Sequence, residues 1–185
     1  MKVKGNTLKA REAFVTERFG AERWAKVMAS LPPEDQSLLR DSVVNVGWYD
    51  FALGERLDQA IATVIGGGNT QVFEEIGRAS ARENLGGVHS NFLEPRDPAK
   101  FMSKAGMIYR CYYYDTGSRS WEATGPTSGV ITTRDSETFS SADCATVIGW
   151  YKEALAMLGA TGVVILEETC RASGGDACRY RVSWK

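Results

Sequence analysis

The sequence predicts an α+β fold in which helices come first and a small antiparallel sheet follows. Up to residue 115, apolar residues recur at the three-to-four-residue spacing of amphipathic helices, and beyond it the two-residue spacing of strands takes over. Hydrophobic residues make up 43% of the 185 residues and charged residues 24%, as in ordinary globular domains. We therefore expect a single domain over 1–185, with a mainly helical half (1–115) and a half holding the sheet and one crossing helix (116–185).

Start and stop signals frame the expected helices. The first ends at Gly20, and Pro32-Pro33 stops the second, because proline cannot continue a helix. Asp50 and Asp97 are placed as N-caps, the latter before a proline at the first helical position. The serine pair Ser140-Ser141 is of the kind that caps a helix and precedes the last one. Residues 34–39 add a turn or two, and 43–48 fit either a strand or an extended linker. The expected helices span 8–19, 24–31, 53–65, 70–85, 98–112 and 147–158.

Four strands are expected in the second half of the chain. Gly125-Pro126 separates the first two, and the turn-forming residues 173–176 separate the last two. The strands span 120–123, 129–133, 163–166 and 180–184.

Three cysteines and a glutamate near the C-terminus suggest a metal site. Cys144 lies where the last helix begins, Cys170 closes a strand and Cys178 opens the next. Three thiolates and the carboxylate of Glu167 can complete a tetrahedral site for structural zinc. Glu168 is the alternative fourth ligand, because on an ideal strand it shares a face with Cys170. Burial of the cysteines as small apolar residues remains the other interpretation.

The spacing Cys…Glu-x-x-Cys-x7-Cys over 144–178 resembles the zinc site of the 4-vinyl reductase domain. That domain forms the sensor part of phenol- and xylene-responsive transcription activators. Upstream, residues 20–24 and the helix after them resemble the opening of haem nitric-oxide-binding domains. Those families and certain TRAPP subunits share one α/β ligand-binding fold. The resemblance implies zinc at Cys144, Glu167, Cys170 and Cys178, and a pocket for a small ligand.

Composition restricts the partners and the compartment. The net charge is −1, from 22 basic and 23 acidic residues spread along the chain, so neither nucleic acid nor a membrane surface is an expected partner. The N-terminus lacks the apolar core of a signal peptide, and no run of 18 apolar residues occurs. We expect a cytoplasmic protein whose cysteines are not in disulfides.

Three residues are candidates for a ligand pocket: His89, Tyr112 and Trp121. The resemblance implies a pocket tryptophan near Trp121, which has an indole N–H to offer a ligand. His89 is the sole histidine. It follows Gly86-Gly87, a poor helix interior, and the Tyr-x-Ser-x-Arg motif that holds haem propionates in haem nitric-oxide-binding domains is absent. We therefore expect no haem.

The expected function is a non-catalytic sensory domain that binds a small hydrophobic or aromatic molecule beside structural zinc and signals through a protein partner. We also expect a homodimer, formed through the aromatic segment 109–114. An adaptor that uses the same fold for protein contacts is the alternative. A zinc enzyme is disfavoured, because a catalytic zinc keeps a position for water, and a haem sensor is disfavoured by the missing motif.

Overall fold

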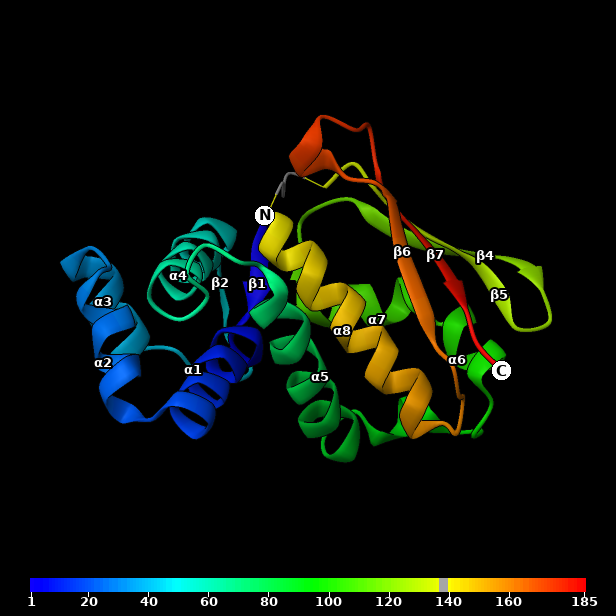
Figure 1. Ribbon diagram of the computed structural model, residues 1–185, viewed down its shortest axis with the longest axis horizontal. Helices are drawn as coiled ribbons and strands as arrows, with labels where there is room; N and C mark the ends of the chain where they lie inside the picture. The colour runs from blue at the N-terminus through cyan, green and yellow to red at the C-terminus, as the bar shows by residue number, and fades with distance from the viewer. Residues whose placement is uncertain (137–139) are drawn as a thin grey trace.

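The structure is a computed structural model that describes residues 1–136 and 140–185 (Figure 1). Its α-helices are α1 (Gly5–Phe19), α2 (Ala21–Ala29), α3 (Pro33–Asp41), α4 (Phe51–Val64), α5 (Gln71–Gly86), α6 (Pro98–Ser103), α7 (Ala105–Tyr112) and α8 (Ser141–Met157). Its strands are β1 (Lys2–Lys4), β2 (Trp48–Asp50), β3 (Tyr113–Tyr114), β4 (Ser118–Gly125), β5 (Ser128–Arg134), β6 (Val164–Thr169) and β7 (Cys178–Ser183). Two 3-10 turns are η1 (Ser90–Leu93) and η2 (Arg171–Ser173). The predicted α+β class is confirmed.

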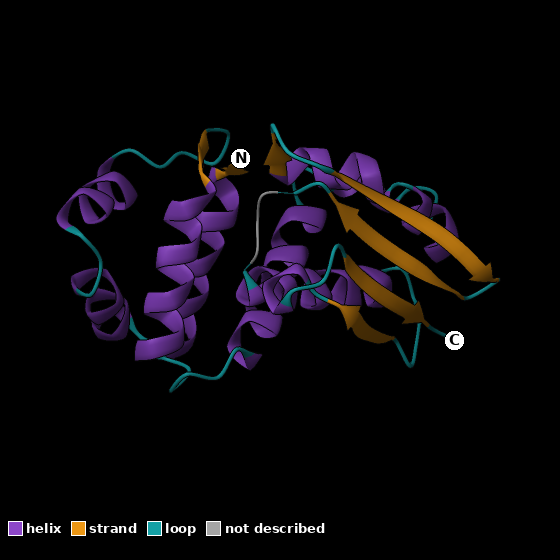
Figure 2. Cartoon of the chain, turned by 90° about the horizontal axis from the view of Figure 1, so that it is seen from above, coloured by secondary structure: helices purple, strands orange, loops and turns teal. Residues whose placement is uncertain are grey.

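Two antiparallel sheets lie in different parts of the molecule. The larger has the strand order β4-β5-β7-β6, so β4 and β6 are its edges. The smaller has the order β2-β1-β3 and joins the N-terminus to the chain before α4 and after α7. Figure 2 shows the larger sheet at one end of the molecule with helices beside it, and the N-terminal helices at the other end.

Helices α5 and α8 lie side by side between these two sides (Figure 1). Glycines allow the close approach. A methyl group added at Gly149 would lie 1.9 Å from the backbone oxygen of Glu74, and one at Gly77 would lie 2.1 Å from that of Thr146. The two backbones therefore touch where each helix carries a glycine.

Helix starts agree with the predicted caps at two places. The Asp97 carboxylate accepts a hydrogen bond from the backbone N–H of Lys100 at 3.1 Å, before Pro98. The Ser140 hydroxyl accepts one from the N–H of Asp143 at 3.2 Å, so α8 begins just before Cys144. These side chains satisfy N–H groups that have no partner inside the helix.

The predicted elements differ from the structure in three respects. The helix expected over 98–112 is divided into α6 and α7 at Lys104, whose ammonium donates to the backbone oxygens of Phe92 and Glu94. Strands β1 and β3 were not expected, because segments of two or three residues are too short to show alternation. Of the undecided stretch 43–48, the final residue, Trp48, begins strand β2. Within the described residues, no helix is both long and apolar enough to cross a membrane.

Candidate functional site

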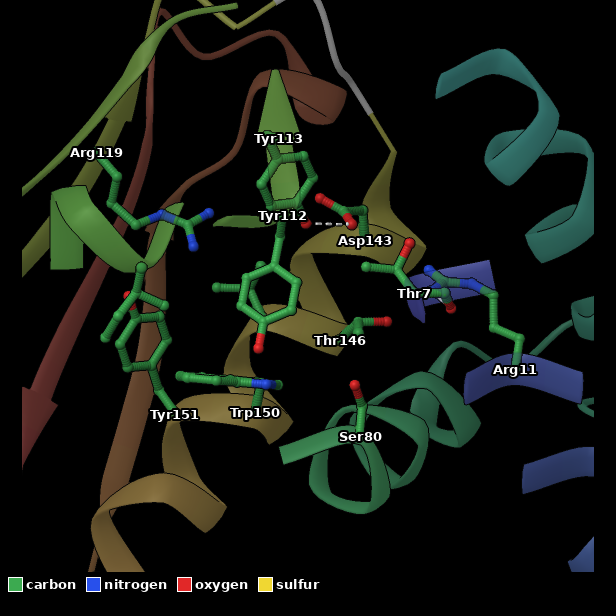
Figure 3. Close-up of a pocket in the computed structure, with 12 residues that line it drawn as sticks. Thr7, Arg11, Ser80, Tyr112, Tyr113, Arg119, Asp143, Thr146, Trp150 and Tyr151 are labelled. Atoms are coloured by element: carbon green, nitrogen blue, oxygen red, sulfur yellow. Dashed lines mark hydrogen bonds between the residues drawn. The ribbon is translucent and has the colours of Figure 1, made fainter. Parts of the chain in front are cut away.

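A cavity of about 40 Å³ lies where α1, α5, α7 and α8 meet strands β3 and β4 (Figure 3). Helix α8 contributes more residues to its wall than any other element. The residues that line it are Thr7, Arg11, Ser80, Ile108, Tyr112, Tyr113, Arg119, Asp143, Thr146, Val147, Trp150 and Tyr151. The cavity is therefore bordered by the N-terminal helix α1, by strand β4 of the larger sheet and by α8.

Arg11, on α1, is a buried arginine whose hydrogen bonds are well satisfied. Its Nη2 donates to the Asp58 carboxylate on α4 at 2.8 Å, and its Nε pairs with the other oxygen of the same carboxylate. Its Nη1 donates to the backbone oxygen of Thr7 at 2.9 Å. Burial alone would lower the pKa of Arg11, but the Asp58 charge outweighs it and raises the pKa. This side chain is held as a fixed cation.

Arg119, on β4, is buried without such a partner. Its Nε donates to the Thr133 hydroxyl at 2.9 Å, and its guanidinium carbon lies 4.9 Å from the ring centroid of Tyr109 and 5.9 Å from that of Tyr151. No carboxylate oxygen of residues 1–136 or 140–185 comes within the 4.0 Å that defines an ion pair with it. Burial acts to lower the pKa of Arg119, and the surrounding tyrosines, Tyr151 foremost, raise it overall. The charge faces aromatic rings rather than an acid.

An acid lies on the other side of the cavity. The Tyr113 hydroxyl donates to the Asp143 carboxylate at 2.7 Å (Figure 3). Burial raises the pKa of Asp143, although Arg11 acts to lower it. Burial also raises the pKa of Tyr113 well above its usual value, and the Asp143 charge adds to this, so the phenol stays a donor.

Three polar atoms of the cavity wall are buried and have no hydrogen-bond partner within 3.5 Å among the described residues. They are the Oη atoms of Tyr112 and Tyr151 and the Nε1 of Trp150. Longer contacts link Tyr112 with Trp150 and Tyr151 with Arg119, and each acts to lower the pKa of the tyrosine, which burial raises. A buried polar group without a partner costs about 1–3 kcal/mol, and native proteins hold few of them. Their grouping beside one cavity suits a small polar ligand that would satisfy them.

The structure separates the three predicted ligand-pocket residues. Tyr112 lines the cavity. His89 is the N-terminal flank of η1; its ring packs against Tyr112 at a centroid distance of 5.7 Å but does not line the cavity. Trp121 packs against Trp184 at 6.2 Å on the larger sheet, away from the cavity wall. Burial, and after it the charge of Lys4, lowers the pKa of His89, so its ring is neutral over a wider range of pH.

The three predicted metal-ligand cysteines do come together. The Cys144 sulfur lies 3.7 Å from that of Cys170 and 3.7 Å from that of Cys178, and all three side chains are buried. Thiolates about 2.3 Å from a tetrahedral metal ion would lie about 3.8 Å apart. A hydrogen bond from Cys144 lowers the pKa of Cys178 to about 6, which favours one thiolate in the cluster. These three residues could hold a metal ion.

Neither glutamate considered as the fourth ligand joins the three sulfurs. Among the described residues, the cluster of possible ligand atoms contains the three cysteines and no carboxylate. Glu167 is exposed on β6, opposite Tyr180. Glu168 lies at a bulge in the pairing of β6 with β7 and forms an ion pair with Arg181.

Comparison with known proteins gives the fold its name. No family model matches the sequence, and no curated protein matches it. Among solved structures, an unliganded Fe(II) H-NOX protein mutant from K. algicida has a TM-score of 0.75 at 12% identity, covering 98% of this chain and 96% of its own. An H-NOX protein from S. oneidensis in the Fe(II)NO state has a TM-score of 0.71 at 15% identity, covering 98% and 99%. The chain has the H-NOX fold.

This likeness corrects several predictions from the sequence. The similar structures are H-NOX proteins, and no 4-vinyl reductase domain is among those named, so the 4-vinyl reductase assignment is wrong. The cofactor recorded with the H-NOX fold is haem, as in the structures with Fe(II)NO, Fe(II)CO and a distorted haem. This finding contradicts the predicted cofactor, which was structural zinc without haem. It also contradicts the predicted zinc-containing sensor of small aromatic molecules and does not favour the adaptor alternative. The spacing of three cysteines and one glutamate predicted a 4-vinyl reductase domain. The path of the whole chain, which that spacing does not reveal, is similar to H-NOX proteins instead.

The residues around the cavity do not fit haem in the packing described. Pockets for drug-sized ligands measure about 300–1,000 Å³, and haem is not smaller than such ligands, whereas this cavity measures about 40 Å³. Aromatic rings occupy the surrounding space: Phe101 stacks on Trp150 at 6.1 Å, and Tyr112 meets Trp150 edge-on at 5.8 Å. His89 lies outside the cavity wall. We therefore derive the function from the chain's own residues.

The sequence analysis did not identify Arg11, Arg119, Asp143, Trp150 and Tyr151 as site residues. One signal was present for Arg119. Arg119 lies between Ser118 and Ser120, whose side chains point to the opposite face of the strand. It shares its own face with Trp121, so this charged side chain is on the more apolar face. A charge in such a position indicates a functional or paired side chain.

Proposed function

We propose that this chain is a small-ligand sensor domain, in which a ligand of a few non-hydrogen atoms binds in the cavity beside α8. The observation that carries the proposal is the grouping of three buried, unpartnered polar atoms around one cavity, those of Tyr112, Trp150 and Tyr151. About 10–15 Å³ holds one water molecule, so about 40 Å³ suits roughly three or four non-hydrogen atoms. A benzene-sized ligand needs about 150 Å³, which is more than the cavity offers.

The cavity is placed to convert binding into a structural change. Its wall combines α1 from the helical side, the edge strand β4 of the larger sheet, α7, which packs against β4, and α8, which packs on α5. A ligand that contacts all of them would favour one arrangement of these elements over another. H-NOX structures offer a parallel, since two of those named above hold NO or CO on Fe(II) in a similar fold.

We infer that the domain acts by binding rather than by catalysis. Neither a cysteine nor a histidine is among the residues that line the cavity. The acid of the wall, Asp143, accepts a hydrogen bond from Tyr113 instead of activating a nucleophile. The output would then pass through a protein partner.

Hydrogen exchange of the whole chain tests the proposal. The ligands to try are small polar molecules, both neutral and charged, each of three or four non-hydrogen atoms. Binding should slow exchange in α1 and α8 together and raise the melting temperature, because the ligand binds the folded state alone. The variant Val147→Leu adds a methylene group to the cavity wall and should abolish the response, whereas Val163→Leu adds the same group elsewhere and should preserve it. A screen in which no such molecule protects α1 and α8 would reject the proposal.

Titration with haem tests the cofactor recorded for this fold. Aromatic side chains pack around Trp150, so a stoichiometric complex would require these rings to move. A stoichiometric complex whose Soret absorption changes in His89→Ala would replace this proposal with a haem-based sensor.

A further inference from the structure

We propose that the cavity binds a small planar oxyanion, held by the Arg119 guanidinium together with the Tyr151 hydroxyl and the Trp150 indole N–H. The inference rests on the proposed ligand-binding function and names the chemical class of the ligand. The two buried arginines of the cavity wall provide its starting point.

These arginines differ in how their charges are balanced. Arg11 has a bidentate carboxylate partner in Asp58 and a backbone oxygen in Thr7. Arg119 is 9% exposed; within 3.5 Å it donates to the neutral Thr133 hydroxyl, and it makes a longer contact with the neutral Tyr151 hydroxyl. A buried charge is costly unless it is paired and hydrogen-bonded. Arg119 therefore presents guanidinium N–H groups to the cavity without an anionic partner.

Further donors border the same space. The Oη of Tyr151 and the Nε1 of Trp150 are buried, line the cavity and have no described hydrogen-bond partner within 3.5 Å. Tyr151 makes a longer contact with Arg119, and Trp150 makes one with Tyr112. Trp150 Nε1 can only donate, and Tyr151 can donate to an anion because its pKa is raised by burial. Figure 3 shows Arg119 and Tyr151 on the same side of the cavity. A guanidinium with two neutral donors is a set that suits an oxyanion.

Size and shape narrow the class of anion. The planar guanidinium fork matches two oxygens of a planar anion, and about 40 Å³ accommodates about three or four non-hydrogen atoms. Formate, bicarbonate and nitrate meet both conditions. Phosphate is tetrahedral and larger, so the cavity should exclude it.

Asp143 limits where the anion can lie. Its carboxylate is also in the wall and would repel an anion, but it already accepts the Tyr113 hydroxyl and lies in the field of Arg11. The anion would therefore occupy the end of the cavity formed by Arg119 and Tyr151. Arg119, like Arg11, also acts to lower the pKa of Asp143, so the bound anion would share the field of Arg119 with this acid.

Calorimetric titration and thermal shift of the whole chain, at constant ionic strength, test this inference. The probes are formate, bicarbonate and nitrate, with phosphate as the oversized anion and formamide as the neutral counterpart of formate. We expect saturable binding of at least one of the three planar anions, and no binding of phosphate. Affinity should fall by about tenfold or more in Arg119→Gln, because a hydrogen bond to a charged group is lost. Arg134→Gln, an exposed arginine on the adjacent strand β5, is the matched control and should bind as the wild type does.

Tyr151→Phe keeps the ring and removes the hydroxyl, so it provides the test if Arg119→Gln does not fold. It should weaken anion binding while leaving the far-ultraviolet circular dichroism unchanged. Failure of all three planar anions to bind, or equal binding by Tyr151→Phe and the wild type, would overturn the inference. If formamide or another neutral molecule binds and is lost in Val147→Leu while no anion binds, the anion inference is wrong but the proposed sensor function survives. If nothing binds, both fall.

Discussion

Arg11 and Asp58 join α1 to α4 through a buried ion pair, with side-chain exposures of 5% and 4%. Removing one member of such a pair leaves an uncompensated buried charge, which typically costs about 3–5 kcal/mol. We expect Asp58→Asn to lower the free energy of unfolding by about this amount, as measured by urea denaturation.

Asp176→Asn, at an exposed position, is the control and should change the stability by less than about 0.5 kcal/mol. A loss in Asp58→Asn no larger than that of the control would show that Arg11 does not depend on its partner.

The metal-ligand role of Cys144, Cys170 and Cys178 remains a prediction, supported by sulfur separations of 3.7 Å between Cys144 and each of the others. With cobalt(II) as a spectroscopic probe, we expect thiolate-to-metal charge-transfer absorption in the wild type and its loss in Cys178→Ser. Cys111→Ser should retain it, because that thiol lies outside the cluster. Absence of this absorption from the wild type would mean that the three cysteines are simply buried side chains.

At the scale of elements, the contact of α5 with α8 depends on glycine. We expect Gly149→Ala to lower the free energy of unfolding by roughly 1–3 kcal/mol or more, because its methyl group would lie 1.9 Å from the backbone oxygen of Glu74. Gly86→Ala, also helical but with nothing within 4 Å of the added methyl, should be neutral or stabilising by up to about 1 kcal/mol. Chemical denaturation of both variants measures the difference. Equal effects would show that α5 and α8 can separate at no cost.

The same helix pair should respond to acid through Glu74. Burial acts to raise the pKa of Glu74, but Lys152 on α8 and Arg78 on α5 outweigh it, so the pKa lies below the usual 4.5. The stabilisation that ionised Glu74 gives to the folded state is therefore complete above about pH 4.5. It is lost as the pH falls through the lowered pKa of Glu74. We expect Glu74→Gln to be less stable than the wild type at neutral pH and to lose less stability on acidification. Parallel stability profiles for the two proteins would contradict this.

At the scale of the whole molecule, the homodimer remains a prediction, but its expected surface has changed. Tyr109, Tyr112 and Tyr113 are buried, and of the tyrosines in 109–114 Tyr114 alone is exposed, at 58%. Edge strand β6 instead exposes Val164 and Leu166, at 46% and 56%. Exposed apolar edges are where sheets of two chains pair.

Light scattering of the purified protein should give twice the chain mass of 20.3 kDa. Leu166→Lys should shift it toward 20.3 kDa, because a charge on the edge opposes pairing. A wild type of 20.3 kDa at tens of micromolar would exclude the dimer.

The sequence by itself determined the features that depend on neighbouring residues. Asp97 and Ser140 cap helices where the sequence placed them, because a cap bonds an N–H three residues away. Cys170 and Cys178 flank a turn at the predicted ends of two strands, which brings their sulfurs near each other with little help from the rest of the fold. Local spacing was enough for these features.

The tertiary structure alone decided the site and the relationships of the fold. Arg119 lines one cavity with Trp150 and Tyr151 because β4 packs beside α7 while α8 packs on α5, and no pattern along the chain encodes this arrangement. Strands β1 and β3 pair Lys2 with Tyr114, which lie far apart in the chain, and both strands have too few residues to show a period. Metal-ligand spacing led instead toward 4-vinyl reductase domains, because four residues can share a spacing while the path of the whole chain follows the H-NOX fold. Long-range packing fixes which side chains face one cavity, and single-sequence periodicity carries no information about it.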